Sequence, residues 1–270
     1  MFSNHPPTPT AILTLEILGR GPRQVQNKVQ LIISILRLYR VGSIKHISYK
    51  MYTKSIIDFG FGSVGTIEVL APSEKYVIKN EDVAQFKEFF NLMIDHVPKN
   101  FDEFTDSDVN HLSTAYKRYC DFLLGSNSDE KKITNLVMGL ESLFLKVEEK
   151  QELSFRLKMR IAKMLSNFGF NPKEVKKIIA KAYDLRSLYV HGGHISYKER
   201  TELEEKFDNV SQFIKTLSNY LRISILIFIL IGISKIEFLD KIDYSFIDKD
   251  ENNRFEILTK SINNTLKIIE

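Results

Sequence analysis

A succession of amphipathic segments occupies the chain from Asp106 onward and leaves room for little but a helical fold. Apolar residues recur at every third or fourth position in each segment, and strand-like alternation is scarce. Turns are expected at the short polar and glycine-containing breaks between the segments. We expect helices at 107–124, 129–148, 152–167, 172–190 and 197–233, with shorter ones near 236–247 and 254–269.

The first hundred residues carry a mixed pattern. Two stretches, 24–39 and 82–94, have a helical period. Strand-like runs are found at 14–18, 45–57, 66–70 and around 76–78. A small sheet with two helices on it accounts for this order. The composition changes after Val97-Pro98, so we expect a mainly α protein with a small α+β N-terminal module of unknown role (1–100) before a helical domain (101–270).

The composition narrows the class of protein. The chain is 43% hydrophobic and 27% charged, which is typical of a soluble globular protein, and its net charge of +4 does not by itself indicate a nucleic-acid partner. A single cysteine, Cys120, excludes a disulfide framework and a cysteine-based zinc site and favours a cytoplasmic location. The most apolar run, 225–233, falls short of the roughly 18 residues that span a bilayer, so we interpret it as the buried centre of a helix and expect no membrane association.

The segment 172–190 has the clearest ends of the expected helices. Asn171 suits the N-cap and Pro172 the first helical position. Arg186 falls on the apolar stripe of this segment, where a guanidinium is costly unless it is paired or lines a cleft. We therefore expect Arg186 to be largely buried and paired with an acidic side chain, Glu141 first. The other members of the stripe are Val175, Ile178, Ile179, Ala182 and Tyr189.

His191 follows Arg186 by five residues and stands directly before Gly192-Gly193, a strong signal for the end of a helix. Five residues rotate a helical side chain by about 140°, so Arg186 and His191 do not share a face of a regular helix. Two copies meeting across a symmetry axis could bring both Arg–His pairs to one groove. We therefore expect a homodimer whose axis lies near this segment.

The residues Arg186-Ser187-Leu188-Tyr189-Val190-His191-Gly192 resemble the R-x4-6-H signature of HEPN domains, in the wording typical of the Apea-like branch. The segment 136–144, which contains Glu141, resembles the acidic helix of that branch. The segments 237–240 and 242–243 resemble its tail. The resemblance covers roughly 106–250 and does not reach the N-terminal part.

The resemblance implies a HEPN-like bundle of four or more helices, dimerisation through the motif face and, often, RNA cleavage without a metal or cofactor. Arg186 and His191 match the catalytic positions, with Glu141 as a supporting partner of the arginine. Active members often carry Asn, Asp or His directly after the arginine, whereas this chain has Ser187. The expected function is a metal-independent endoribonuclease in defence or stress response. The alternative is a non-catalytic HEPN module that binds nucleotide, RNA or a protein partner.

The residue types suit this chemistry. Histidine titrates near neutral pH and can move the proton of the RNA 2′-OH, while arginine can bind phosphate oxygens in a bidentate fork. A purely structural role, in which both side chains cap carbonyls and Arg186 pairs with Glu141, is the competing interpretation. The basic run on the same helix is either a solvated face or a contact for the RNA backbone. It consists of Lys173, Lys176, Lys177 and Lys181.

Two other patterns are interpreted as coincidental. The G-x-G-x-x-G of 60–65 is followed by a strand-like run rather than a helix, and the kinase motif H-R-D-x-x-x-x-N is missing, so a glycine-rich hairpin turn is expected there. His191 and His194 are three residues apart but have no third Cys or His nearby, so we expect no metal site.

Overall fold

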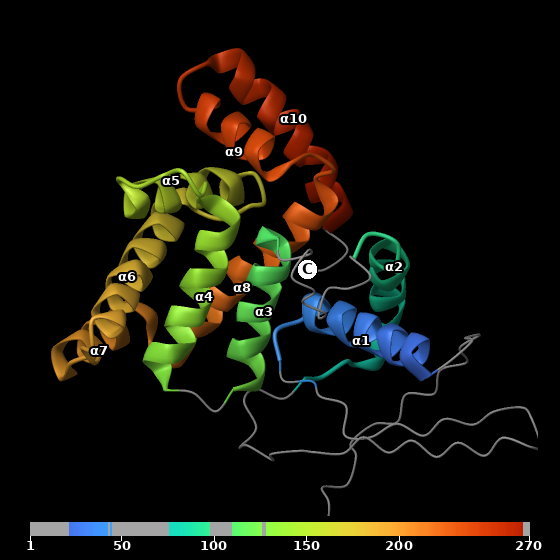
Figure 1. Ribbon diagram of the computed structural model, residues 1–270, viewed down its shortest axis with the longest axis horizontal. Coiled ribbons are helices and arrows are strands. Elements are labelled where there is room, and N and C mark those ends of the chain that lie inside the picture. The colour runs from blue at the N-terminus through green and yellow to red at the C-terminus, as the bar shows by residue number, and fades with distance from the viewer. Residues whose placement is uncertain (1–21, 43, 45–75, 98–109, 126–127, 267–270) are drawn as a thin grey trace, which may run out of the picture.

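The computed structural model describes residues 22–42, 44, 76–97, 110–125 and 128–266, and this part of the chain is mainly helical (Figure 1). No strand occurs within these ranges, and the expected helical bundle is found. The helices are α1 (Pro22–Tyr39), α2 (Val83–Met93, preceded by the 3-10 turn η1, Asn80–Asp82), α3 (His111–Leu124), α4 (Asp129–Phe144), α5 (Leu153–Ser166), α6 (Pro172–Val190), α7 (Tyr197–Phe207), α8 (Val210–Leu230), α9 (Lys235–Tyr244) and α10 (Lys249–Leu266).

The small N-terminal sheet finds no support. Three of the four strand-like runs, 14–18, 45–57 and 66–70, lie outside the described residues, as does the glycine-rich segment 60–65. The fourth, 76–78, is described and forms no strand, so that prediction is wrong. Side-chain hydrogen bonds, rather than the backbone hydrogen bonds of a sheet, hold this segment against α1. The Tyr76 hydroxyl donates to the Leu36 carbonyl at 2.6 Å, and Arg40 Nη1 donates to the Val77 carbonyl at 3.3 Å.

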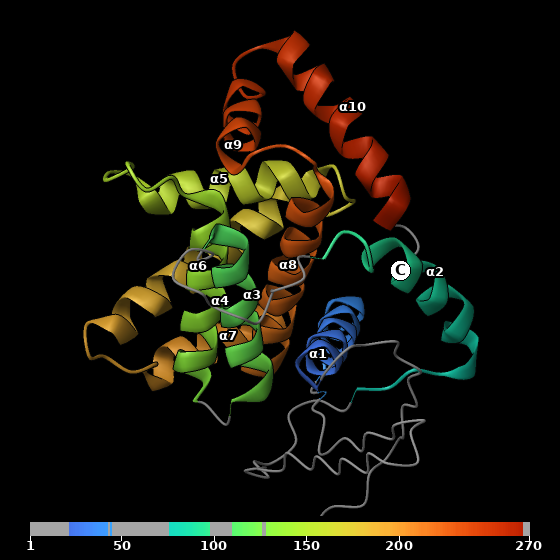
Figure 2. The same ribbon diagram turned by 45° about the vertical axis from the view of Figure 1, so that its right-hand side comes forward.

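The centre of the bundle is α4, which packs against α3, α6 and α8 (Figure 1). Its inward residues Leu136, Leu140 and Leu143 are fully buried. Gly139 allows the close approach to α8, because a Cβ atom at this position would lie 2.7 Å from Cδ2 of Leu221. The hairpin of α9 and α10 sits at one end of the bundle (Figure 2), and the C-terminal end of α6 lies at the other end (Figure 1).

The described residues on the two sides of Val97-Pro98 share one hydrophobic core. Ile35 and Leu38 of α1 are fully buried in the same cluster as the side chains of α4 and α8. The buried Arg222 of α8 completes the contact, since its Nη1 donates to the Leu38 and Tyr39 carbonyls at 2.8 and 2.9 Å. A cation at this position stabilises the C-terminal end of α1, where the carbonyls have no partners within the helix.

The single helix expected at 197–233 is two helices, α7 and α8, so that prediction is wrong. Asp208 breaks the run with a φ of +64°, a conformation that non-glycine residues rarely adopt. Asn209 then acts as the N-cap of α8, its side chain accepting from the Gln212 N–H at 2.7 Å. The segments on both sides of Asp208 have a helical period, but the capping residue Asn209 between them starts a new helix.

The helix α8 is the one described helix long and apolar enough to cross a membrane, by length and composition only. In this structure 67% of its most apolar stretch is buried inside the bundle. Ile225, Leu226 and Ile227 are fully buried. The run at 225–233 therefore begins in the buried core, but it lies at the C-terminal end of α8 and just beyond it rather than at the centre of a helix.

Candidate functional site

The ends of α6 lie where the sequence predicts them. At the start, Oδ1 of Asn171 accepts from the Lys173 and Glu174 N–H groups at 3.0 and 3.4 Å. At the end, the Gly193 N–H reaches the Leu188 carbonyl at 2.9 Å and the Gly192 N–H reaches that of Tyr189 at 3.0 Å. This is a Schellman motif, and Gly192 supplies its left-handed residue with a φ of +85°. The helix is therefore regular through Val190.

The buried stripe of α6 ends on Leu185 rather than on Arg186. Leu185 is 2% exposed, whereas the side chain of Arg186 is 25% exposed and lies at the edge of the core. The expectation that Arg186 lies on the stripe itself is therefore correct only in part, because either of the two neighbouring residues satisfies the helical period after Ala182. The apolar residue takes the interior position, and the charged one reaches the rim.

Arg186 and Glu141 form the expected ion pair between α6 and α4. Nη2 of Arg186 donates to Oε2 of Glu141 at 3.2 Å, and the glutamate side chain is 18% exposed. Burial raises the pKa of Glu141, and the nearby Arg186 charge opposes that shift. The guanidinium carbon also lies 5.9 Å from the ring centre of Tyr183. Nε of Arg186 is buried without a hydrogen-bond partner among the described residues.

His191 lies apart from that ion pair. It is the C-cap of α6, it is exposed, and its backbone N–H donates to the Ser187 carbonyl at 3.2 Å. Since α6 is regular through Val190, the rotation of about 140° between Arg186 and His191 applies. In the described part of the chain the recorded contacts of Arg186 are with Glu141 and Tyr183, and none joins it to His191. One subunit therefore does not bring the two motif side chains together.

The basic run of α6 is mostly free of ion pairs to described residues. Lys173, Lys176 and Lys177 are exposed. Nζ of Lys181 lies 3.4 Å from Oε2 of Glu202 on α7, which ties the two helices together. Three of the four lysines thus face solvent on the side of α6 away from the core.

Comparisons with protein-family models, with curated proteins and with solved structures find no match to this chain. The resemblance to HEPN domains therefore rests on the motif residues and the segments around them.

His194 is exposed, as His191 is. The described residues contain no group of three or more His, Cys, Asp or Glu side chains placed to hold a metal ion.

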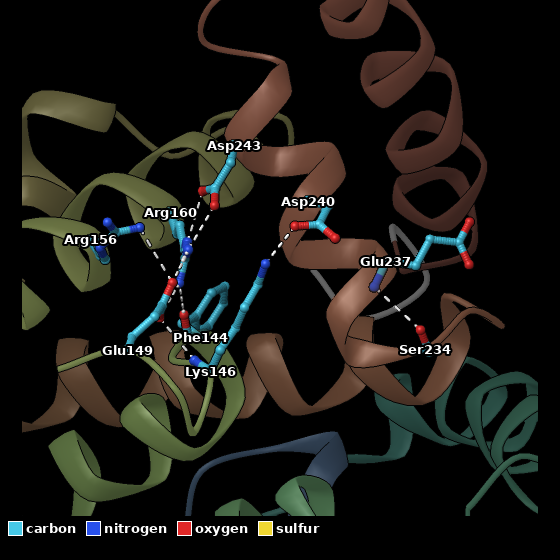
Figure 3. Close-up of polar contacts among 9 residues, drawn as sticks. All are labelled: Phe144, Lys146, Glu149, Arg156, Arg160, Ser234, Glu237, Asp240 and Asp243. Carbon is cyan, nitrogen blue, oxygen red and sulfur yellow. Dashed lines mark hydrogen bonds and ion pairs between the residues drawn. The ribbon is translucent and has the colours of Figure 1, made fainter.

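A second polar cluster, which the sequence interpretation missed, surrounds Arg160 of α5 (Figure 3). The arginine side chain is 1% exposed and makes five hydrogen bonds. Two go to Asp243 of α9 at 2.8 and 2.6 Å, two to Glu149 at 2.9 and 2.6 Å, and one to the Phe144 carbonyl at 2.7 Å. All five N–H groups of the guanidinium are satisfied.

The Arg160 cluster joins the end of α4, the following loop, α5 and α9. Burial of Glu149 opposes ionisation, but the hydrogen bonds from Arg160 and from the Lys146 N–H, together with the arginine charges, hold its pKa below the usual range. A signal was available in the sequence. Arg160 falls between Leu157, Ile161 and Met164, all buried, at the same kind of stripe position that drew attention to Arg186. Arg160 and Glu149, at 1% and 10% exposed, are too buried to meet a substrate, whereas Asp243 is 37% exposed.

Proposed function

We propose that this chain is a HEPN-type endoribonuclease that works as a homodimer and cleaves RNA without a metal, in defence or stress response. The observation that carries the proposal is the placement of Arg186. Its guanidinium lies at the rim of the bundle, is 25% exposed and is oriented by Glu141. The exposed His191 ends the same helix five residues later.

The two side chains divide the reaction between them. His191 accepts the proton of the RNA 2′-OH, and that oxygen attacks the adjacent phosphorus. Arg186 binds the phosphate oxygens and stabilises the charge they gain in the transition state. The bond to the 5′ oxygen breaks, that oxygen takes a proton from a second acid, and the products are a 2′,3′-cyclic phosphate and a free 5′-OH.

The geometry of α6 is the argument for a dimer. The side chains of Arg186 and His191 diverge by about 140° on a helix that stays regular to its end. A pair of subunits related by a two-fold axis at the end of α6 supplies a second arginine and a second histidine to one groove. Val190, the residue before His191, and Tyr197, the first residue of α7, are 54% and 87% exposed and offer apolar surface for that contact. Lys173, Lys176 and Lys177 then extend the path of the RNA backbone along α6.

The second candidate is a non-catalytic HEPN module that binds nucleotide, RNA or a protein partner. The ion pair between Arg186 and Glu141 favours it, since a guanidinium held by a carboxylate must exchange that partner for a phosphate. Ser187 also favours this candidate, because the resemblance implies Asn, Asp or His at this position in active members.

Purified full-length protein incubated with bulk RNA separates the two candidates. The enzyme cuts RNA equally well with and without a chelator, leaves 2′,3′-cyclic phosphate ends and spares DNA, which lacks the attacking hydroxyl. Protein that binds RNA or nucleotide but cuts no RNA under these conditions is the non-catalytic module. Cleavage that the chelator abolishes contradicts the metal-independent mechanism.

A further inference from the structure

A groove on the α9–α10 hairpin is used neither by the proposed cleavage nor by the Arg160 cluster. Its volume is about 540 Å³, and it is open to solvent. Five of its lining residues follow one side of α9 at helical spacing, and one comes from the start of α10. They are Ile236, Glu237, Asp240, Lys241, Tyr244 and Glu251.

Exposed apolar side chains lie on α9 and in the turn directly after it. Ile236 and Tyr244, which line it, are 57% and 53% exposed. Phe246 and Ile247, in the turn that follows, are 44% and 80% exposed. Four large apolar residues this exposed within one short segment are a candidate contact surface.

α9 is held firmly on the bundle. On the side away from the groove, Phe238, Leu239 and Ile242 are fully buried. Asp243 is bound by Arg160, and Asp240, which lines the groove, accepts from Nζ of Lys146 (Figure 3). A helix fixed in this way presents its outer side in one arrangement, which lowers the entropy that a partner must lose on binding.

The charge of the groove indicates the kind of partner. The chain as a whole carries a net charge of +4, yet the segment from Lys235 to Glu256 contains seven acidic and four basic residues. Each of the three lining carboxylates has one cation nearby: Glu237 (53% exposed) pairs with Lys241, Asp240 (42%) with Lys146 and Glu251 (30%) with Arg254. The pairs of Glu237 and Glu251 are local contacts within one helix and contribute little, so an incoming ammonium or guanidinium can share the oxygens of these two carboxylates.

We propose that this groove binds an amphipathic segment of another protein whose apolar side chains are flanked by lysine or arginine. The segment lies along α9 as a helix in a groove, the mode in which residues spaced by three and four positions act as anchors. Its apolar side chains pack on Ile236 and Tyr244. Its cations lie near Glu237 and Glu251 at the two ends of the groove.

The test uses the full chain and two fluorescent peptides of about five helical turns. Both carry leucine on one face, flanked by lysine in the first peptide and by glutamate in the second. Fluorescence anisotropy is expected to show that the lysine peptide binds at least about tenfold more tightly than the glutamate peptide. The double substitution Ile236→Ser and Tyr244→Ser is expected to weaken the lysine peptide by about tenfold or more. Ile257→Ser is the matched control, since Ile257 is 71% exposed on α10 and does not line the groove.

Charge reversal makes the test specific. Glu237→Lys combined with Glu251→Lys is expected to invert the preference between the two peptides. Equal binding of both peptides, or binding of the lysine peptide that the serine variants leave unchanged, overturns the proposal, and so does no binding at about 100 μM. Analytical ultracentrifugation of the wild type tests whether a second copy of this chain occupies the groove. Self-association that the double serine variant abolishes would assign the groove to that second copy and overturn the proposal. All substituted positions are exposed or half-exposed, so circular dichroism should report an unchanged fold.

Discussion

Arg186 and Glu141 meet where α6 packs on α4, with Nη2 of the arginine 3.2 Å from Oε2 of the glutamate, although 45 residues separate them in the sequence. Neither side chain is fully buried, at 25% and 18% exposed. The expected contribution of this pair to stability is therefore intermediate. Surface ion pairs contribute almost nothing to stability, whereas loss of one partner of a buried pair leaves an unpaired charge in the interior.

Arg186→Ala is expected to lower the free energy of unfolding by about 1–3 kcal/mol, less than the roughly 3–5 kcal/mol of a fully buried pair. The loss arises because Glu141 keeps a half-buried charge without its partner. Urea unfolding measures the change, with Lys176→Ala on the exposed face of the same helix as the control, expected within about 0.5 kcal/mol of wild type. An unchanged midpoint for Arg186→Ala would show that Glu141 does not depend on the arginine.

Arg160→Ala is expected to be the more damaging substitution, costing about 3–5 kcal/mol, because it leaves Glu149 and Asp243 facing each other without their cation. Arg160→Lys should not restore stability, since an ammonium cannot form two bidentate contacts. The control is Arg156→Ala, also on α5 and also paired with Glu149, at 3.4 Å, but 41% exposed. It is expected to cost about 0–1 kcal/mol. Equal losses for Arg160→Ala and Arg156→Ala would contradict the assignment of the cluster as a buried clamp.

The contrast between these two arginines shows what the sequence could predict. The ends of α6 depend on neighbours within a few residues, Asn171 at one end and Gly192 at the other, so they were predicted correctly. The Arg160 cluster depends on Asp243, which is 83 residues away in the sequence, and no local sequence pattern predicts the contact between Arg160 and Asp243. The choice between Leu185 and Arg186 as the buried residue depends on how α4 approaches α6, which helical periodicity alone does not specify. The break at Asp208-Asn209 could have been found from the capping residue.

For the candidate site, the sequence predicted the pairing of Arg186 with Glu141 but not the degree of exposure. The position of His191 on a different side of α6 followed from the rotation per residue, because the two glycines end the helix only after the histidine. The catalytic role of Arg186 and His191 stays a prediction, because RNA cleavage depends on where a second subunit and an RNA strand lie.

Acid is expected to destabilise the protein through His111. Burial, reinforced by the charge of Lys235, lowers the pKa of His111 to about 4 from an ordinary value of 6.5. The unfolded chain therefore binds more protons than the folded one between these values, so stability is complete above about pH 6.5 and is lost as the pH falls toward 4. His111→Gln should flatten this dependence in urea unfolding between pH 4 and 6.5. His194→Gln, at an exposed position, serves as the control and should keep the wild-type slope.

A helix-capping substitution tests the break between α7 and α8. The Asn209 side chain accepts the Gln212 N–H at 2.7 Å and starts α8. Asn209→Ala is expected to cost about 1 kcal/mol, and Asn209→Asp should retain most of the stability because it keeps the acceptor oxygen. Thermal unfolding followed by circular dichroism measures both. Equal stability of wild type and Asn209→Ala would mean that the cap contributes nothing to the start of α8.

The last prediction separates chemistry from structure at the end of α6. His191→Ala is expected to abolish RNA cleavage while leaving the fold and the dimer intact, because the side chain is exposed and its contribution to the Schellman motif comes from the backbone. His194→Ala, also exposed and three residues further on, should retain most of the activity. Cleavage of a labelled RNA gives the rates, and light scattering gives the oligomeric state of each variant. If both substitutions abolish cleavage equally, the histidine has been placed wrongly. If His191→Ala cuts RNA as fast as wild type, His191 is no acid or base in the reaction, and Arg186 acts with a group elsewhere in the chain.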